Sequence, residues 1–209
     1  MSKRVYISAD YSENDGDRNV IDELHKWADD NLHKIDFADT AKVVSGSVSD
    51  NSDCRICDLK KEFNEQINAS SIVIFIIGDK TKSRTAGSSC PRNKDGYSNS
   101  YCTPYKENCK GLKHCKHIIV TSPDPNGDIG YINTYSYLRH EFEEAVKRNK
   151  TIIILYNSLY DMPSWLPSYM NDYKEDAHHF WIKNTNGDRV GDYQYVKKAL
   201  GYVWLYKKV

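Results

Sequence analysis

The sequence predicts an α/β protein whose open parallel β-sheet carries helices on both faces. Short apolar segments that are typical of strands alternate with amphipathic segments that are typical of helices. Residues 70–78 (SSIVIFIIG) and 151–157 (TIIILYN) are apolar without alternation, as expected of parallel strands that are covered on both faces. The length of 209 residues suits one domain.

The first part of the chain contains two strand–helix units and a third strand. Residues 4–9 (RVYISA) form the first strand, and residues 19–31 (NVIDELHKWADDN) repeat apolar side chains at helical spacing after Asp17, a suitable N-cap. Residues 35–43 (IDFADTAKV) are a weaker strand candidate. A second amphipathic helix leads to the apolar strand at residues 70–78. The apolar face of this helix consists of Ile56, Leu59, Phe63 and Ile67.

The alternation stops at about residues 84–133, where Gly, Pro, Asn, Lys, Tyr and Cys replace it. A structureless loop of that length is uncommon inside a compact domain. We therefore predict a single domain, residues 1–209, with a Cys/Lys-rich folded insertion or lid at about 84–133.

Beyond the insertion the alternation resumes with a helix and the strand at 151–157. A shorter strand at 177–183 (AHHFWIK) and a closing helix within 191–204 (GDYQYVKKALGYVW) follow. Adjacent residues of a strand point to opposite faces, so we do not expect His178 and His179 to bind one ion. In doubly wound sheets, ligands bind at the carboxyl ends of the strands.

The six cysteines indicate thiols or a metal rather than disulfides, because the chain shows no signal peptide and no apolar stretch that could span a bilayer. For the same reason we expect a cytoplasmic protein with no membrane partner. Cys54 and Cys57 form an isolated C-x-x-C pair, for which we expect no redox role. Four thiols in the insertion could satisfy a tetrahedral zinc, but they lack the tight C-x-x-C hairpins of zinc modules, so we rank reduced thiols ahead of a structural zinc. These four are Cys90, Cys102, Cys109 and Cys115.

In the helix before residues 151–157, Glu141 is the carboxylate that we expect to lie closest to the protein core. At roughly 100° per residue, the apolar residues of this helix form one stripe. The stripe consists of Leu138, Phe142, Ala145 and Val146. Glu141 falls between Tyr137 and Ala145 on the core side, whereas Glu143 and Glu144 project toward solvent. A local salt bridge or boundary position would explain Glu141, and a carboxylate at the wall of a pocket is the functional alternative.

Three stretches resemble the TIR domain family. VYISADYSEND (5–15) is similar to the family's opening strand and loop, and IGDKTKSR (77–84) is similar to the stretch after its third strand. YSYLRHEFEEAVKRNKTIIIL (135–155) is similar to the helix that carries an aromatic residue, three further residues and a Glu before an apolar strand. The layout resembles most the TIR-like proteins of Thoeris anti-phage systems. Ala9 and Asp10 depart from the pattern, since many members have an aromatic residue after the Ser.

The resemblance implies a TIR/flavodoxin-like fold, with the insertion placed before the catalytic helix and Glu141 as the catalytic carboxylate. The implied reaction cleaves the nicotinamide–ribose bond of NAD and forms ADP-ribose, a cyclic ADP-ribose isomer or an ADP-ribose conjugate that serves as an immune signal. A carboxylate would stabilise the oxocarbenium-like ribosyl cation, as in glycoside hydrolysis. NAD is then the substrate, and no metal or other cofactor is required.

The resemblance also implies a set of substrate-binding residues around the first strand–helix loop, the second strand and the start of the catalytic helix. They are Ser8, Asp10, Tyr11, Phe37, Asp39 and Tyr137. The implied partners, besides NAD, are a phage-derived activator, a downstream effector that senses the product, and further copies of the chain that assemble through TIR contacts. We expect no nucleic-acid partner, because 29 basic and 29 acidic side chains leave no net charge.

Two other functions compete with an NAD-cleaving enzyme. A non-catalytic TIR-type interaction module shares the resemblance, but it has no need for a half-buried carboxylate such as Glu141. A phospho-acceptor receiver domain shares the sheet, but it requires an Asp at the end of the third strand and a Lys at the end of the fifth. In this chain the third strand ends at Gly78 and is followed by Asp79, and the last strand offers Lys183 as the lysine.

Overall fold

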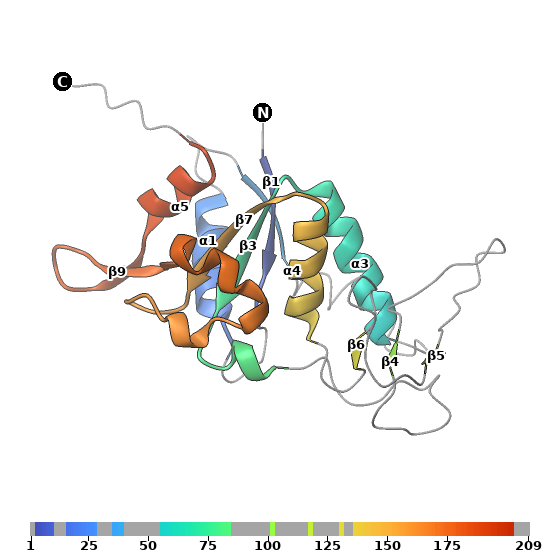
Figure 1. Cartoon of the computed structure of the whole chain (residues 1–209). Helices are drawn as coiled ribbons and strands as arrows, with labels where there is room; N and C mark the ends of the chain where they lie inside the picture. The colour runs from blue at the N-terminus through green and yellow to red at the C-terminus, as the bar shows by residue number, and fades with distance from the viewer. Residues whose placement is uncertain are drawn as a thin grey trace.

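The computed structural model of the chain describes residues 3–10, 16–28, 35–39, 55–84, 101–102, 117–118, 130–131 and 136–202. Its centre is a five-stranded parallel sheet with the strand order β2-β1-β3-β7-β8 (Figure 1). The strands are β1 (Lys3–Ser8), β2 (Ile35–Asp39), β3 (Ile72–Ile77), β7 (Thr151–Tyr156) and β8 (His178–His179). The predicted α/β class is confirmed.

The strand order places the first and third strands side by side, which is the flavodoxin-like form of a doubly wound sheet. The winding direction reverses between β1 and β3. All five strands run parallel, so their carboxyl ends share one edge, and ligands of such sheets bind at that edge beside the reversal point. Ser8 ends β1 at this edge, and Gly78 directly follows β3.

Helices cover both faces of the sheet. One face packs against α1 (Arg18–Ala28) and α5 (Tyr193–Ala199), and the other packs against α3 (Arg55–Ala69) and α4 (Tyr137–Lys147) (Figure 1). Alternate residues of each strand supply the two cores. In β1, Val5 and Ile7 join the α1 side and Tyr6 joins the α3–α4 side. This two-sided burial explains why β3 contains no polar residue.

The predicted strand at 177–183 is wrong as a single element. It is divided between β8, which pairs with β7, and β9 (Trp181–Lys183), which forms an antiparallel pair with β10 (Arg189–Gly191). The division occurs at Phe180, whose N–H donates to the carbonyl of Tyr156 at 2.8 Å in the last bond of the parallel pair, whereas its carbonyl accepts from the Asp192 N–H at 2.7 Å, directly after β10. Short 3₁₀ helices fill the remaining connections: η1 (Thr81–Ser83), η2 (Pro163–Trp165) and η3 (Ser168–Asp176).

Within the predicted insertion the structure describes three two-residue strands, which pair antiparallel in the order β5-β4-β6. They are β4 (Tyr101–Cys102), β5 (His117–Ile118) and β6 (Gly130–Tyr131). Cys90, Cys109 and Cys115 lie outside the described residues. Among the helices that are described, none has the length and apolar character needed to cross a membrane.

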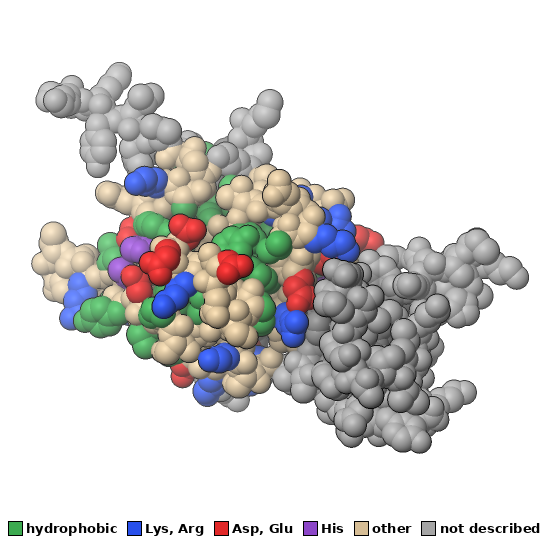
Figure 2. Space-filling view, in the orientation of Figure 1, with side chains coloured by type: hydrophobic (Ala, Val, Ile, Leu, Met, Phe, Trp, Pro, Cys, Tyr) green, Lys and Arg blue, Asp and Glu red, His purple; other side chains and the backbone are tan. Residues whose placement is uncertain are grey.

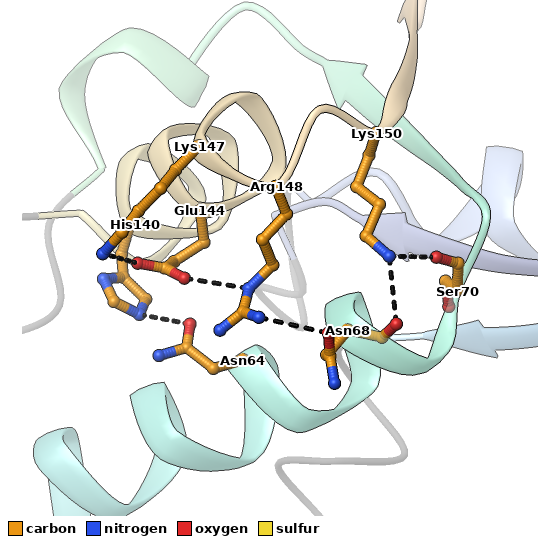
Figure 3. Close-up of polar contacts among 8 residues, drawn as sticks. All are labelled: Asn64, Asn68, Ser70, His140, Glu144, Lys147, Arg148 and Lys150. Atoms are coloured by element: carbon orange, nitrogen blue, oxygen red, sulfur yellow. Dashed lines mark hydrogen bonds and ion pairs between the residues drawn. The ribbon is translucent and has the colours of Figure 1, made fainter.

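Polar side chains connect α3 with α4 (Figure 3). His140 Nε2 lies 3.0 Å from Asn64 Oδ1, and Arg148 Nη1 donates to Asn68 Oδ1 at 3.1 Å. Glu144 accepts from Arg148 Nε at 3.1 Å and from Lys147 Nζ at 3.4 Å.

The predicted orientation of Glu144 toward solvent is therefore wrong, because its side chain is buried at the flank of α3. The assignment of Val146 to the buried apolar stripe is also wrong, since Val146 is 44% exposed. Both errors have one cause. A single stripe assumes one packing surface, whereas α4 packs against the sheet and against α3.

We predict that Glu144→Ala lowers the free energy of unfolding by about 1–2 kcal/mol, because it removes a buried acceptor of two charged donors. Glu143→Ala is the matched control. Its side chain is 42% exposed in an ion pair with Arg139, so its loss should stay within about 0.5 kcal/mol. Urea unfolding of both variants measures the difference, and equal losses would contradict the buried role of Glu144.

Candidate functional site

The Glu141 carboxylate lies buried between α4 and the central sheet. One oxygen accepts a hydrogen bond from the Tyr6 hydroxyl, and the other accepts one from the Ser8 hydroxyl. Glu141 is 1% exposed, and Tyr6 and Ser8 are fully buried. The structure thus brings together Glu141 and Ser8, two of the residues predicted from the sequence, and adds Tyr6.

Local geometry explains why these three side chains meet. Residues two apart on a strand share a face, so Tyr6 and Ser8 both point toward the α3–α4 side, while Val5 and Ile7 point to the other. Ser136 caps α4 by accepting from the Arg139 N–H at 2.9 Å, which sets where the helix begins. Glu141 then follows one turn after Tyr137 on the core side of the helix.

The chemistry of this arrangement is that of a buried acid with two hydroxyl donors. Burying a carboxylate is costly unless hydrogen bonds replace its water, and Tyr6 and Ser8 supply one bond to each oxygen. Ser8 is the last residue of β1, beside the reversal point of the sheet. The carboxylate therefore lies where this type of sheet binds its ligands.

Asp10 lies two residues beyond β1 and joins two loops of the same edge. Its carboxylate accepts from Arg84 Nε at 2.5 Å, so the segment after β1 is tied to the segment after β3. Its carbonyl accepts from the Asp17 N–H at 2.7 Å. Asp10 is thus placed at the predicted edge, with Arg84 as a partner that sequence reasoning missed.

The other predicted substrate-binding residues are placed less completely. Phe37 and Asp39 belong to β2, where they pair with Val5 and Ile7, but their side chains lie outside the description. Tyr11 lies outside the described residues. Tyr137 begins α4, and its ring lies edge-on to that of Phe63 with 5.4 Å between the centroids, which ties it to helix packing. Substrate binding by Phe37, Asp39, Tyr11 and Tyr137 stays a prediction.

Tyr156 is a second residue that the sequence reading missed. It ends β7 on the same face as Tyr6, and it is fully buried. Its hydroxyl has no hydrogen-bond partner among the described residues, which is rare for a buried polar atom. Burial raises the pKa of the Tyr156 phenol, and the charge of Asp161 raises it further. The feature of the sequence that could have indicated Tyr156 is a tyrosine at the end of a mostly aliphatic strand.

Asp17 is a buried acid at the same edge of the sheet, on the α1 side. It is 3% exposed and accepts from Asn157 Nδ2 at 2.8 Å. Burial raises the pKa of Asp17 to about 7, although the hydrogen bond from Asn157 lowers it. The negative charge of Asp10 raises this pKa further. A Cβ at Gly78 would lie 2.5 Å from Asp17 Oδ1, so the glycine makes room for the carboxyl group. The predicted N-cap thus carries a long-range contact as well.

We predict that Tyr6→Phe costs about 1–3 kcal/mol of unfolding free energy, because it leaves the buried Glu141 carboxylate one donor short. In a Glu141→Gln background the same change should cost about half as much, since hydrogen bonds to a charged acceptor are roughly twice as strong as neutral ones. A double-mutant cycle by urea unfolding measures this coupling. Additive effects would mean that the Tyr6 contact does not stabilise the carboxylate.

We predict that Asp17→Asn removes a pH dependence of stability. The folded pKa of about 7 lies above the ordinary value of 3.8, so protonated Asp17 favours the folded state and stability falls as pH rises from 3.8 to 7. Asp17→Asn should therefore gain up to about 4 kcal/mol at pH 8 and little at pH 4, at about 1.36 kcal/mol per pKa unit. Urea unfolding at both pH values tests this. Asp22→Asn, at an exposed position of α1, is the control. Parallel pH profiles for Asp17→Asn and the wild type would refute the prediction.

Two comparisons with known proteins give no guide to this site. A scan against protein-family models finds no family that matches the chain, and a search of curated proteins finds no match. The fold and the Glu141 geometry are therefore the observations from which a function can be argued.

Proposed function

We propose that the chain is a TIR-type NAD-cleaving enzyme of bacterial anti-phage defence, with Glu141 as its catalytic carboxylate. The observation that supports this best is a buried carboxylate whose two oxygens are held by hydroxyls at the carboxyl edge of a flavodoxin-like sheet. The reaction releases nicotinamide and forms ADP-ribose, a cyclic isomer or a conjugate that serves as an immune signal.

The hydrogen bonds of Glu141 suggest how ribose would bind. The Tyr6 and Ser8 hydroxyls are donors of the same kind as the hydroxyls of a ribose. A ribose can therefore replace one of them at the carboxylate with little electrostatic loss. The negative charge would then lie beside the sugar as its glycosidic bond breaks and positive charge develops on the ring.

Access to Glu141 requires a rearrangement, because the side chain is 1% exposed. In this proposal the resting chain is inactive, and a phage-derived activator or self-assembly through TIR contacts opens the site. The Asp10–Arg84 ion pair is the contact that we expect to change, since it joins the segments that follow β1 and β3. We place the reaction in the cytoplasm, with a downstream effector that senses the product.

A second function, a non-catalytic TIR-type interaction module, is favoured by one observation. Both oxygens of Glu141 are hydrogen-bonded inside the fold, which is also how a purely structural carboxylate is held. The two functions differ in what Glu141→Gln changes. In both cases Glu141→Gln weakens the hydrogen bonds from Tyr6 and Ser8 and lowers stability. Only in an enzyme does the variant that remains folded also lose turnover.

We predict that Glu141→Gln lowers the rate of nicotinamide release by a factor on the order of 10² to 10³ or more, because the amide keeps the shape and loses the charge. The rate is measured in phage-infected cells that express the chain, so that an activator is present. Glu143→Gln, the same change on the exposed side of α4, is the control and should keep the wild-type rate. Thermal unfolding should verify that both variants are folded.

Equal rates for the wild type and Glu141→Gln would refute the assignment of Glu141. Infected cells in which the wild type leaves NAD intact while protection from phage persists would instead favour the interaction module. If the wild type does not cleave NAD, loss of protection in both Glu141→Gln and Tyr6→Phe would support the same conclusion.

A further inference from the structure

Three potential metal ligands gather at the carboxyl end of β7, whereas the hydroxyls that hold Glu141 come from Tyr6 and Ser8 of β1. One side-chain ligand atom from each of Asp161, His178 and His179 lies within 4.8 Å of the other two. The imidazole rings have centroids 4.1 Å apart. Our expectation that His178 and His179 do not bind one ion rested on side chains that point to opposite faces, whereas here their ligand atoms lie on one side. The strand β8 is only two residues long, and the chain leaves the parallel sheet at Phe180.

The cluster is held in place by contacts with the surrounding structure. The His179 N–H of the backbone donates to Asp161 Oδ1 at 2.8 Å, and His179 Nδ1 lies 2.9 Å from the same oxygen. The His178 ring stacks on Tyr195 with 3.8 Å between centroids, and its Nε2 lies 3.5 Å from Asp192 Oδ2. A carboxylate that faces the second nitrogen of a ligating imidazole is a common feature of metal sites, because it orients the ring.

We propose that Asp161, His178 and His179 form a binding site for a divalent transition-metal ion, with zinc as the best-suited probe. Two imidazoles and one carboxylate suit zinc and its neighbours, whereas magnesium and calcium require mostly oxygen ligands. Metal–ligand bonds of about 2.0–2.2 Å in a tetrahedral site place the ligand atoms roughly 3.4 Å apart. The observed spacing, 2.9 Å between His179 Nδ1 and Asp161 Oδ1 and within 4.8 Å for all three ligand atoms, brackets this value, so side-chain adjustments would admit the ion.

The ion can reach the site from solvent. The side chain of Asp161 is 53% exposed, and those of His178 and His179 are 27% and 25% exposed. Histidine side chains lie beside acidic groups on the face of the molecule shown in Figure 2. Three protein ligands leave a fourth position for water.

Binding would connect the two ends of the segment between β7 and β8, which contains η2 and η3. Leu166 and Met170 of this segment pack into the core on the Glu141 side of the sheet. An ion that binds the folded chain and not the unfolded chain stabilises the fold by mass action. The site is therefore expected to act as a structural clamp on this segment.

The test is a zinc titration of the full chain after chelator treatment and dialysis, followed by calorimetry and thermal unfolding. We expect one site with a dissociation constant on the order of micromolar or tighter, and a rise in the unfolding temperature on binding. Asp161→Asn and His179→Gln should each weaken binding at least about tenfold and abolish the thermal shift. His25→Gln, a histidine of α1 outside the cluster, should bind like the wild type.

Cobalt distinguishes this site from the cysteines of the chain. Thiolate ligands produce an intense sulfur-to-cobalt charge-transfer absorption, whereas a site of nitrogen and oxygen ligands shows only weak visible bands. The proposal expects weak bands that disappear in His179→Gln. Undetectable zinc binding, equal affinity in the Asp161 and His179 variants and the wild type, or cobalt spectra dominated by thiolate absorption would each overturn it. Circular dichroism of the metal-free variants establishes that they are folded.

Discussion

The hydrogen bonding of one buried carboxylate constrains the whole carboxyl edge of the sheet. Glu141 exchanges water for the Tyr6 and Ser8 hydroxyls, which come from alternate residues of β1. A shift of β1 by one residue would present Val5 and Ile7 to the carboxylate instead, and Glu141 would lose both hydroxyl donors. The hydrogen bonds of Glu141 can therefore form only when β1 pairs with its neighbours in the observed register.

The hydrogen bonding of Glu141 also requires one rotation of α4 about its own axis, and contacts with α3 fix that rotation. Apolar packing alone holds a helix on a sheet but tolerates some rotation, whereas directional contacts do not. His140 pairs with Asn64 of α3, and Glu144 holds Arg148, which reaches Asn68. These contacts lie on the α3 side of α4 and keep Glu141 directed toward β1. The polar network between the helices thus supports the candidate site.

Much of this architecture could be predicted because it depends on local patterns. The uninterrupted apolar runs of β3 and β7 indicated buried parallel strands, and helical spacing placed Glu141 toward the core. What failed depends on neighbours distant in sequence. Glu144 is buried because α3 lies beside α4, and Asp17 is buried because Gly78 and Asn157 enclose it. The division of residues 177–183 accompanies a backbone hydrogen bond from the Asp192 N–H to the Phe180 carbonyl, a partner that no spacing in the sequence indicates.

The side-chain amide of Asn157 connects three segments that are distant in sequence, with its nitrogen as donor on one side and its oxygen as acceptor on the other. Its amide nitrogen donates to Asp17, just before α1, while its amide oxygen accepts from Trp181 Nε1 at 2.7 Å and from Arg189 Nη2 at 3.2 Å, on the β9–β10 pair. Reversing the amide would set two donors against its NH₂ group and its oxygen against a carboxyl group. The ionised Asp17 therefore fixes the orientation of the amide, and one side chain holds the segment before α1 to the edge of a different sheet.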